Sequence, residues 1–353
     1  MGYWNSKNAI ESKAQYKIII GERGNGKSYN IKSYALKCFL SHSEEFIYLR
    51  RQKEDIKPSQ VESYFSDLNI DKLTNGAYQS IVAWGGKIFL SKLDNGVLKR
   101  SLCIGYYMSL SAWEHFKSSQ FPNVERIIFE EFTASHKLSS NITYLPKESE
   151  KLIQLVSTVF RERIGEVYLI GNTVDRTCPY FFDWQLDFIP KMNNGDCTTL
   201  SIPISDTRVV SIYVEKTKNE SNKHSMIFGK ARNVIASGKW EVNEYKTIFP
   251  KGDIEKLYKL YYKNNFIFVI ELYIDTNSGV MFNFIYPYTK KIIPDGERVI
   301  DVNYMMIDMQ GLTSDTFKVY NKLEKIIYEN IKTNNTVYAS NECGTDFNSL
   351  FTL

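Results

Sequence analysis

The chain has 353 residues, of which 43% are hydrophobic and 24% charged, and its net charge is +4. This length exceeds one typical domain and fits two. No apolar run reaches the ~20 residues of a membrane span, and the first residues contain no apolar signal-peptide core, so nothing in the sequence indicates a membrane span or secretion. The five cysteines form no C-x-x-C pair, so we expect neither a zinc site nor disulfides, and a reducing, cytosolic location.

The positive surplus is confined to one stretch. Residues 201–260 contain 11 Lys or Arg against 7 Asp or Glu, whereas the rest of the chain has 33 of each. Such a segment can attract nucleic-acid phosphates. It can equally be a solvated surface with extra lysines, and charge alone leaves both interpretations open.

Residues 21–28 form a complete phosphate-binding loop of the pattern G-x-x-x-x-G-K-[ST]. The apolar run 16–20 before it predicts a buried strand, and residues 29–40 after it predict a helix with one apolar face. In this setting Lys27 would reach the β- and γ-phosphates and the Ser28 hydroxyl would hold Mg²⁺. The predicted ligands are therefore ATP and Mg²⁺, and the predicted nucleotide-binding residues are Gly21, Glu22, Arg23, Gly24, Asn25, Gly26, Lys27, Ser28, Tyr29 and Arg50.

Up to about residue 200, strands and helices alternate, which predicts a mostly parallel α/β sheet. Further strands are expected at 46–50, 124–129 and 166–170, and helices at 58–68, 111–118 and 146–161. Gly85 and Gly86 separate two apolar runs, 78–84 and 87–92, which predicts a hairpin; residues 97–108 add a third strand to it.

After residue 201 the composition changes. Residues 215–247 are rich in Lys, Asn, Ser and Glu, which is typical of a connecting module. Strands are expected at 266–273, 280–286 and 299–308, and an amphipathic helix at 317–332. We therefore predict three parts: a P-loop ATPase domain at 1–200, a basic linker module at 201–247 and an α+β C-terminal domain at 248–353.

Hydrolysis needs more than the loop, and residues 126–131 supply an apolar strand that ends in two carboxylates, the form of a Walker B motif. We expect this strand beside the first one, with Glu130 at the Mg²⁺ shell and Glu131 polarising the attacking water. The usual residue at the first position is Asp. Glu130 is one methylene longer and could reach the metal through a water.

Other polar residues follow the predicted strands and helices. Asn172 ends the strand after the Walker B strand, where it would sense the γ-phosphate or orient the water, or serve only as a turn residue. Arg161 ends the helix 146–161, either as an arginine finger for a neighbouring subunit or as a solvated helix end. Arg50 and Arg51 end the second strand and either couple the nucleotide to other surfaces or pair with acids.

These landmarks, in this order, resemble the genome-packaging ATPases of small phi29-like bacteriophages. The resemblance is clear over residues 16–185 and weaker beyond, where it rests on 228–229 and 266–282. Its family-specific elements are Tyr-Leu-Arg-Arg at 48–51 and Val-Phe-Arg at 159–161. The other matching segments are 20–29, 46–47, 117–118, 122–124, 129–132, 171–174 and 179–181.

The resemblance implies a P-loop NTPase of the additional-strand, catalytic-glutamate class. Such proteins form a ring, by resemblance a pentamer, that pumps double-stranded DNA into a preformed capsid at the portal vertex, in the cytoplasm of the infected bacterium. The resemblance also implies that Lys27 and Ser28 bind phosphate and Mg²⁺ and that Glu131 is the catalytic glutamate. Arg161 and Lys117 are then trans-acting residues. The family has Asp where this chain has Glu130. Relatives use a packaging RNA, a partner on which this sequence is silent.

The resemblance also implies that the C-terminal domain is an RNase H-like nuclease that has lost its activity. The acids that could suggest nuclease chemistry are Asp275, Asp301 and Asp308, and no two-metal cluster can be assembled from them. We interpret them as turn and surface residues.

Three other functions compete with a packaging motor. One is another P-loop nucleic-acid translocase or helicase, the second a small-molecule P-loop kinase and the third a nucleotide-gated switch. A kinase would need an Arg-rich lid, which is not obvious in this sequence. It would not need a separate β-rich C-terminal domain. A switch would not need Glu131 at a strand end.

Overall fold

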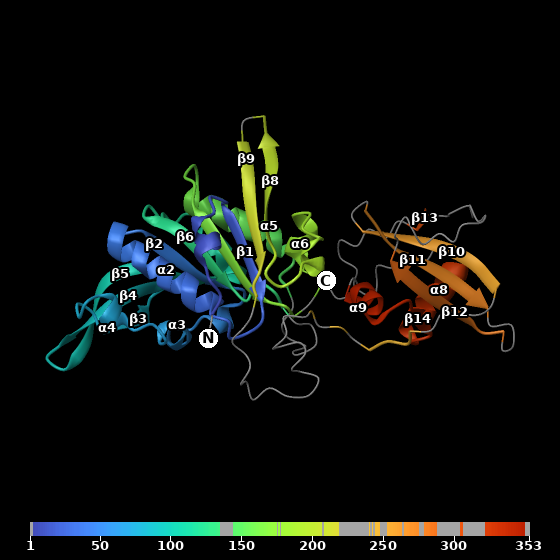
Figure 1. The fold of residues 1–353 in the computed structure, drawn as a ribbon, viewed down its shortest axis with the longest axis horizontal. Helices are drawn as coiled ribbons and strands as arrows, with labels where there is room; N and C mark the ends of the chain where they lie inside the picture. The colour runs from blue at the N-terminus through green and yellow to red at the C-terminus, as the bar shows by residue number, and fades with distance from the viewer. Residues whose placement is uncertain are drawn as a thin grey trace. The chain divides into compact units, whose positions relative to one another are not determined.

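The computed structural model describes residues 3–134, 144–174, 176, 178–206, 208–218, 240, 242, 244–247, 253–262, 265–274, 279–287, 304–305 and 322–349. The chain divides into two compact units, Met1–Glu241 and Val242–Leu353, each with its own sheet (Figure 1). Within the described ranges, no helix combines the length and the apolar character that crossing a membrane requires.

The described part of the first unit forms one nine-stranded sheet. Its strands are β1 (Tyr16–Gly21), β2 (Glu45–Arg50), β3 (Ser80–Trp84), β4 (Lys87–Asp94), β5 (Val97–Ser109), β6 (Val124–Glu130), β7 (Glu166–Asn172), β8 (Cys197–Ser205) and β9 (Arg208–Lys216). Their order across the sheet is β3-β4-β5-β2-β6-β7-β1-β9-β8. The strands from β5 across to β9 run parallel, and β3, β4 and β8 extend the two edges by antiparallel pairing.

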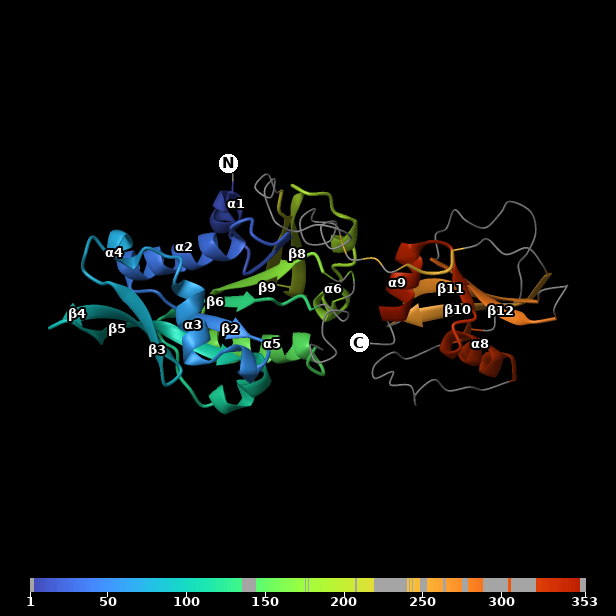
Figure 2. The same ribbon diagram turned by 90° about the horizontal axis from the view of Figure 1, so that it is seen from below.

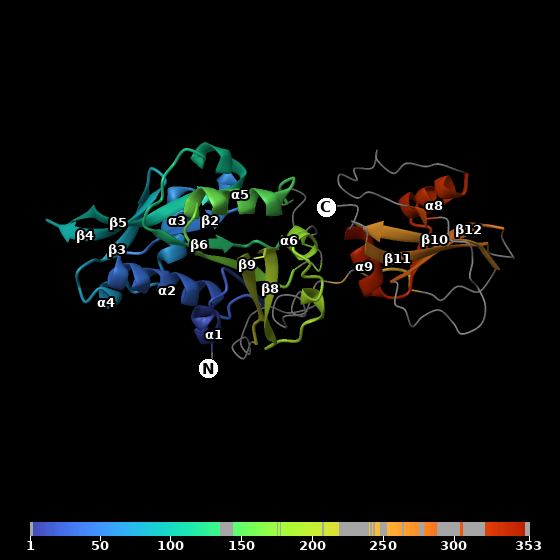
Figure 3. The same ribbon diagram turned by 90° about the horizontal axis from the view of Figure 1, so that it is seen from above.

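Helices cover both faces of this sheet. They are α1 (Lys7–Glu11), α2 (Lys27–His42), α3 (Pro58–Phe65), α4 (Ile70–Leu73), α5 (Glu148–Phe160) and α6 (Pro179–Asp183), with short 3-10 helices η1 (Lys53–Asp55), η2 (Leu110–Phe116) and η3 (Ile189–Lys191). Figures 2 and 3 show α2 and α5 on opposite sides of the sheet.

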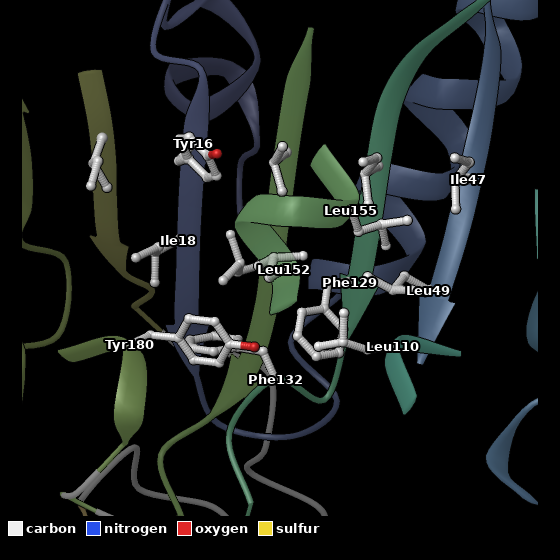
Figure 4. Close-up of a cluster of buried hydrophobic side chains, with 14 of the residues drawn as sticks. Tyr16, Ile18, Ile47, Leu49, Leu110, Phe129, Phe132, Leu152, Leu155 and Tyr180 are labelled. Atoms are coloured by element: carbon white, nitrogen blue, oxygen red, sulfur yellow. The ribbon is translucent and has the colours of Figure 1, made fainter. Parts of the chain in front are cut away.

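The central strands are apolar on both sides because both faces are covered. Successive side chains alternate between two cores: Ile18 and Ile20 of β1 belong to the core that contains α5, and Ile19 to the core that contains α2. Figure 4 shows the first of these cores, in which Leu152 and Leu155 of α5 lie over side chains from β1, β2 and β6. The predicted α/β architecture is thereby confirmed for this unit.

From the sequence we expected β6, the strand of the Walker B pattern, to lie beside β1. It does not. β7 lies between them and pairs in parallel with both strands. Its residues Val167 to Ile170 are buried, so β7 fills a central place in the sheet. The helix expected at 111–118 is also different: it is the 3-10 helix η2, which ends at Phe116 and is interrupted by non-helical torsions at Ala112.

The expected domain boundary at residue 200 falls inside β8. Residues 201–205 complete β8, and β9 follows and pairs in parallel with β1. Ile212 and Val214 of β9, together with Trp240, are buried in the core beneath α5. The early part of the expected linker module therefore belongs to the sheet of the first unit, and most of its remainder, at 219–239, lies outside the described residues.

The second unit contains a five-stranded sheet in its described residues. Its elements are β10 (Asp253–Tyr262), β11 (Asn265–Ile274), β12 (Met281–Pro287), β13 (Tyr304–Met305), α8 (Lys322–Lys332), β14 (Thr336–Tyr338) and α9 (Asn341–Ser349). β10, β11 and β12 form an antiparallel meander, whereas β13 and β14 add parallel strands at its two edges. Of the strand expected at 299–308, only Tyr304 and Met305 are described. Asp275, Asp301 and Asp308 lie outside the described residues.

Candidate nucleotide site

A cavity of about 790 Å³ opens at the carboxyl ends of β1, β6 and β7. This is the edge of an open α/β sheet at which ligands bind, and the volume suits a nucleotide. The predicted site residues that line it are Arg23, Gly24, Asn25, Gly26, Lys27, Ser28, Tyr29, Glu130, Glu131 and Asn172. Gly21, Glu22, Arg50, Lys117 and Arg161 are not among its lining residues.

The phosphate-binding loop is closely packed against its surroundings. Gly24 and Gly26 have φ angles of 75° and 89°, which a side chain would disfavour. At Gly21 an added Cβ would lie 1.9 Å from the Thr217 hydroxyl oxygen, so this position excludes any larger residue unless Thr217 moves. The loop can therefore present backbone N–H groups to an anion at close range.

The Lys27 ammonium group is turned onto its own loop. It donates to the carbonyl oxygens of Gly21 and Glu22 at 3.1 and 2.6 Å, and to the Asn25 and Asn172 side-chain oxygens at 3.2 and 3.4 Å. Burial lowers the pKa of Lys27 to about 8, although Glu130 and Glu22 oppose this shift. An anionic phosphate near the ammonium group would favour its charged form.

Ser28, in the first turn of α2, contacts Glu130, the last residue of β6. The Ser28 hydroxyl donates to Glu130 Oε2 at 3.0 Å, and the Tyr64 hydroxyl donates to Oε1 at 2.7 Å. The Glu130 carboxyl group is almost completely buried, and burial raises its pKa even though both hydrogen bonds favour the charged form. Two hard oxygen donors are thus brought together beside the phosphate-binding loop.

Glu131 has an unusual backbone conformation. Its φ is 55°, a left-handed value that L-residues other than Asn and Asp rarely adopt. The half-exposed carboxylate accepts a hydrogen bond from Arg50 at 2.6 Å, and Arg51 donates to the Glu131 carbonyl oxygen at 3.2 Å. Arg50 therefore contacts the candidate catalytic glutamate and does not line the cavity.

Asn172 is held in place at the end of β7. Its backbone N–H donates to the Thr133 hydroxyl at 3.0 Å, and its carbonyl oxygen accepts from that hydroxyl at 2.9 Å. Its side-chain oxygen faces the Lys27 ammonium group at 3.4 Å. The Asn172 amide therefore lies within hydrogen-bonding reach of the Lys27 ammonium group.

Arg161 and Lys117 lie away from the cavity. α5 begins at Glu148, which Arg51 links to the residues after β6. The helix ends at Phe160, near the beginning of β6. There Arg163 donates to the Val124 carbonyl oxygen at 3.0 Å. Arg161 follows with a φ of 54° and an exposed side chain. Lys117 is exposed, pairs with Glu114 at 3.4 Å and lies 4.4 Å from the centre of the Trp113 ring.

Two residues that the sequence did not indicate, Trp4 and Thr217, form hydrogen bonds with the phosphate-binding loop. Trp4 donates its backbone N–H to the Asn25 carbonyl oxygen at 2.9 Å and its indole N–H to Glu215 at 2.6 Å. Asn25 in turn donates to the Thr217 hydroxyl at 2.5 Å. Trp4 precedes all recognisable motifs, and Thr217 lies in the stretch that composition assigned to a linker, so neither position carried a local signal.

The parallel sheet, the phosphate-binding loop after β1 and the paired carboxylates at the end of β6 define a P-loop NTPase. The family model described as podovirus DNA encapsidation protein (Gp16) matches residues 2–338, and the chain belongs to this family. The resemblance to the DNA-packaging proteins of phi29-like bacteriophages noted in the sequence is thus confirmed.

Curated relatives support this assignment. The DNA packaging protein of Bacillus phage B103 is 33% identical over 209 residues, a match that spans 57% of each chain. That of Bacillus phage phi29 is 27% identical over 286 residues, covering 79% of this chain and 78% of its own length. The same fold occurs in the solved bacteriophage phi29 viral genome packaging motor assembly, with a TM-score of 0.55 and 21% identity over 99% of both chains.

Proposed function

We propose that the chain is one subunit of a ring-shaped motor that couples ATP hydrolysis to the movement of double-stranded DNA into a preformed capsid at the portal. The observation that carries this proposal is the position of Arg161. The phi29 protein with the same fold belongs to a viral genome packaging motor assembly, which supports an oligomeric state for this chain.

Arg161 is at the wrong edge of the sheet to serve its own cavity. The cavity lies at the carboxyl end of β7, whereas α5 ends near the amino ends of β6 and β7. The seven residues of β7 span about 20 Å, more than an arginine side chain can reach. An arginine that stabilises phosphoryl transfer from this position acts on the cavity of a second copy. Lys117, which is also exposed, is assigned to the same neighbouring cavity.

The remaining roles follow from the contacts in the cavity. Ser28 and Glu130 fit a Mg²⁺ ion because their oxygens converge at 3.0 Å beside the loop; the ion would neutralise charge on the phosphate oxygens. Lys27 binds the β- and γ-phosphates, and Asn172 orients the γ-phosphate or the attacking water. Glu131 accepts the proton of that water once its carboxylate leaves Arg50.

We assign the second unit to a divergent RNase H-like domain without nuclease activity. Support comes from its mixed sheet, which combines an antiparallel meander with parallel edge strands and two helices. The basic stretch at 201–260 would contact the DNA backbone or the portal in a salt-sensitive manner. The motor would act in the cytoplasm of the infected bacterium, transiently at the portal vertex, with or without a packaging RNA.

Mixed assemblies test the proposal. Glu131→Gln should bind ATP but lose DNA-stimulated hydrolysis by about 100-fold or more, because proton transfer from water is lost. Arg161→Ala alone should be similarly impaired, whereas Arg100→Ala, which changes another exposed arginine outside the basic stretch, should retain activity. Mixing Glu131→Gln with Arg161→Ala subunits should restore part of the activity at interfaces that join an intact glutamate to an intact arginine.

Two outcomes would overturn this function. Verified mixed rings without any recovery would exclude Arg161 as a residue that acts on a neighbour. ATP turnover that requires a small phosphate acceptor and ignores DNA would instead indicate a kinase. Both measurements need purified subunits, DNA, a small phosphate acceptor and an assay for ADP, because a kinase passes the phosphate to its acceptor and does not release it.

A further inference from the structure

Tyr64 is the side chain outside all recognised motifs that makes the closest contact with the proposed metal-binding group. It lies in α3, which follows the second strand of the sheet. Its hydroxyl donates to Glu130 Oε1 at 2.7 Å, while Ser28 donates to the other oxygen, Oε2, at 3.0 Å. Each oxygen of the Glu130 carboxylate therefore has its own donor, from a different helix.

The Tyr64 ring is held by two neighbouring side chains. The ring of Tyr48 in β2 stacks on it, with 4.3 Å between ring centres and 17° between ring planes. The Lys32 ammonium group lies 4.4 Å from its centre, donates to the Tyr64 carbonyl oxygen and pairs with Asp67. The hydroxyl is thus held in one orientation before any ligand arrives, which reduces the entropy lost when it orders Glu130.

The contact with Tyr64 restrains the Glu130 side chain, which is longer than that of an aspartate. A glutamate has one more rotatable bond than an aspartate, so its carboxylate needs additional restraint to present one oxygen in a defined direction. If the Ser28 oxygen bound a cation through a lone pair, its O–H could still donate to Glu130 Oε2, and the Tyr64 hydroxyl would hold the other carboxylate oxygen from a second helix. Hydrogen bonds of this kind orient the carboxylates that bind metals.

We propose that Tyr64 is a positioning residue for the divalent cation: it holds the Glu130 carboxylate so that Oε2 points to the cation beside Ser28. This inference rests on the proposed roles of Ser28 and Glu130 in holding Mg²⁺. It assigns no contact between Tyr64 and the nucleotide, and it explains how this chain uses a glutamate at the end of the Walker B strand.

Binding of Mn²⁺, measured by electron paramagnetic resonance in the presence of a non-hydrolysable ATP analogue, tests this without relying on activity. Tyr64→Phe should weaken Mn²⁺ binding by about 10-fold, because the ring remains and only the hydrogen bond is removed. The matched control is Tyr286→Phe, which removes a tyrosine-to-glutamate hydrogen bond of 2.8 Å in the second unit and should leave Mn²⁺ binding unchanged. Thermal unfolding establishes that both variants are folded.

A double substitution separates positioning from general damage. The shorter side chain of Glu130→Asp retreats from the Tyr64 hydroxyl, so Tyr64→Phe should change Mn²⁺ binding by less than about 3-fold in that background. An equal loss in both backgrounds, or no loss in Tyr64→Phe alone, would overturn the inference. Unchanged Mn²⁺ binding in Glu130→Ala would instead refute the proposed metal role of Glu130 itself, so the two failures are distinguishable.

Discussion

Arg51 and Glu148 form a buried ion pair with two hydrogen bonds, at 2.7 Å from Nε and 3.1 Å from Nη2. Arg51 also donates to the carbonyl oxygens of Glu131 and Phe132, and the Tyr180 hydroxyl donates to Glu148 at 2.9 Å. The pair therefore joins the residue after β2, the first residue of α5 and the backbone after β6. It supports the left-handed conformation of the candidate catalytic glutamate.

Removing Arg51 should destabilise the first unit strongly. Arg51→Ala leaves the Glu148 carboxylate buried without its counter-charge, and we expect a loss of about 3–5 kcal/mol in the free energy of unfolding. Lys99→Ala, which breaks the exposed pair with Asp94, should cost less than about 1 kcal/mol. Urea unfolding followed by circular dichroism measures both. Equal costs for the two substitutions would contradict the assigned role of Arg51.

The sequence contained enough to predict the central sheet and the loop. Strand runs such as 16–20 and 166–170 are apolar at successive positions because both faces of the sheet are covered, and this signal is local. The phosphate-binding loop and the paired carboxylates at 130–131 are likewise contiguous in sequence. Their convergence in one cavity followed from the rule that parallel strands end at the same edge.

The long-range contacts could not be predicted in this way. β9 joins β1 from about 190 residues away, and the composition of this segment gave no indication that it belongs to the sheet of the first unit. Tyr64 lies in a helix whose apolar pattern predicted only packing, yet its hydroxyl contacts Glu130. Such pairings depend on strand order and on tertiary packing, which a single sequence with local patterns does not encode in readable form.

Thiol reactivity should differ sharply among the cysteines. Cys178 is buried, and burial raises its pKa to about 12; the same holds for Cys343. The thiolate is the nucleophile, so both thiols should remain protonated and unreactive at pH 8, whereas the exposed Cys197 should react with iodoacetamide. Mass spectrometry of the native and the urea-unfolded protein measures this. Rapid native modification of Cys178 would contradict its burial in the core.

Trp4 should contribute to stability through its indole N–H. Trp4→Phe keeps an aromatic ring but removes the indole donor to Glu215, which retains its hydrogen bond from Tyr213 at 2.6 Å. We expect a loss of about 1–3 kcal/mol in unfolding free energy, because the buried Glu215 carboxylate loses the indole donor. The matched control Trp84→Phe changes an exposed tryptophan and should cost below about 1 kcal/mol. Indistinguishable melting temperatures for the two variants would argue against this contact.

Gly21 and Thr217 should be energetically coupled. In Gly21→Ala the new methyl group would lie 1.9 Å from the Thr217 hydroxyl oxygen, so the loop or the residue after β9 must shift. We expect weaker ATP binding and about 1–3 kcal/mol lower stability. Thr217→Ala removes that oxygen, although it also removes the hydrogen bond from Asn25. In the double variant part of the lost stability should therefore return. The double variant should lose less stability than the sum of the two single losses in a double-mutant cycle. Strictly additive losses would show that the two residues do not meet as described.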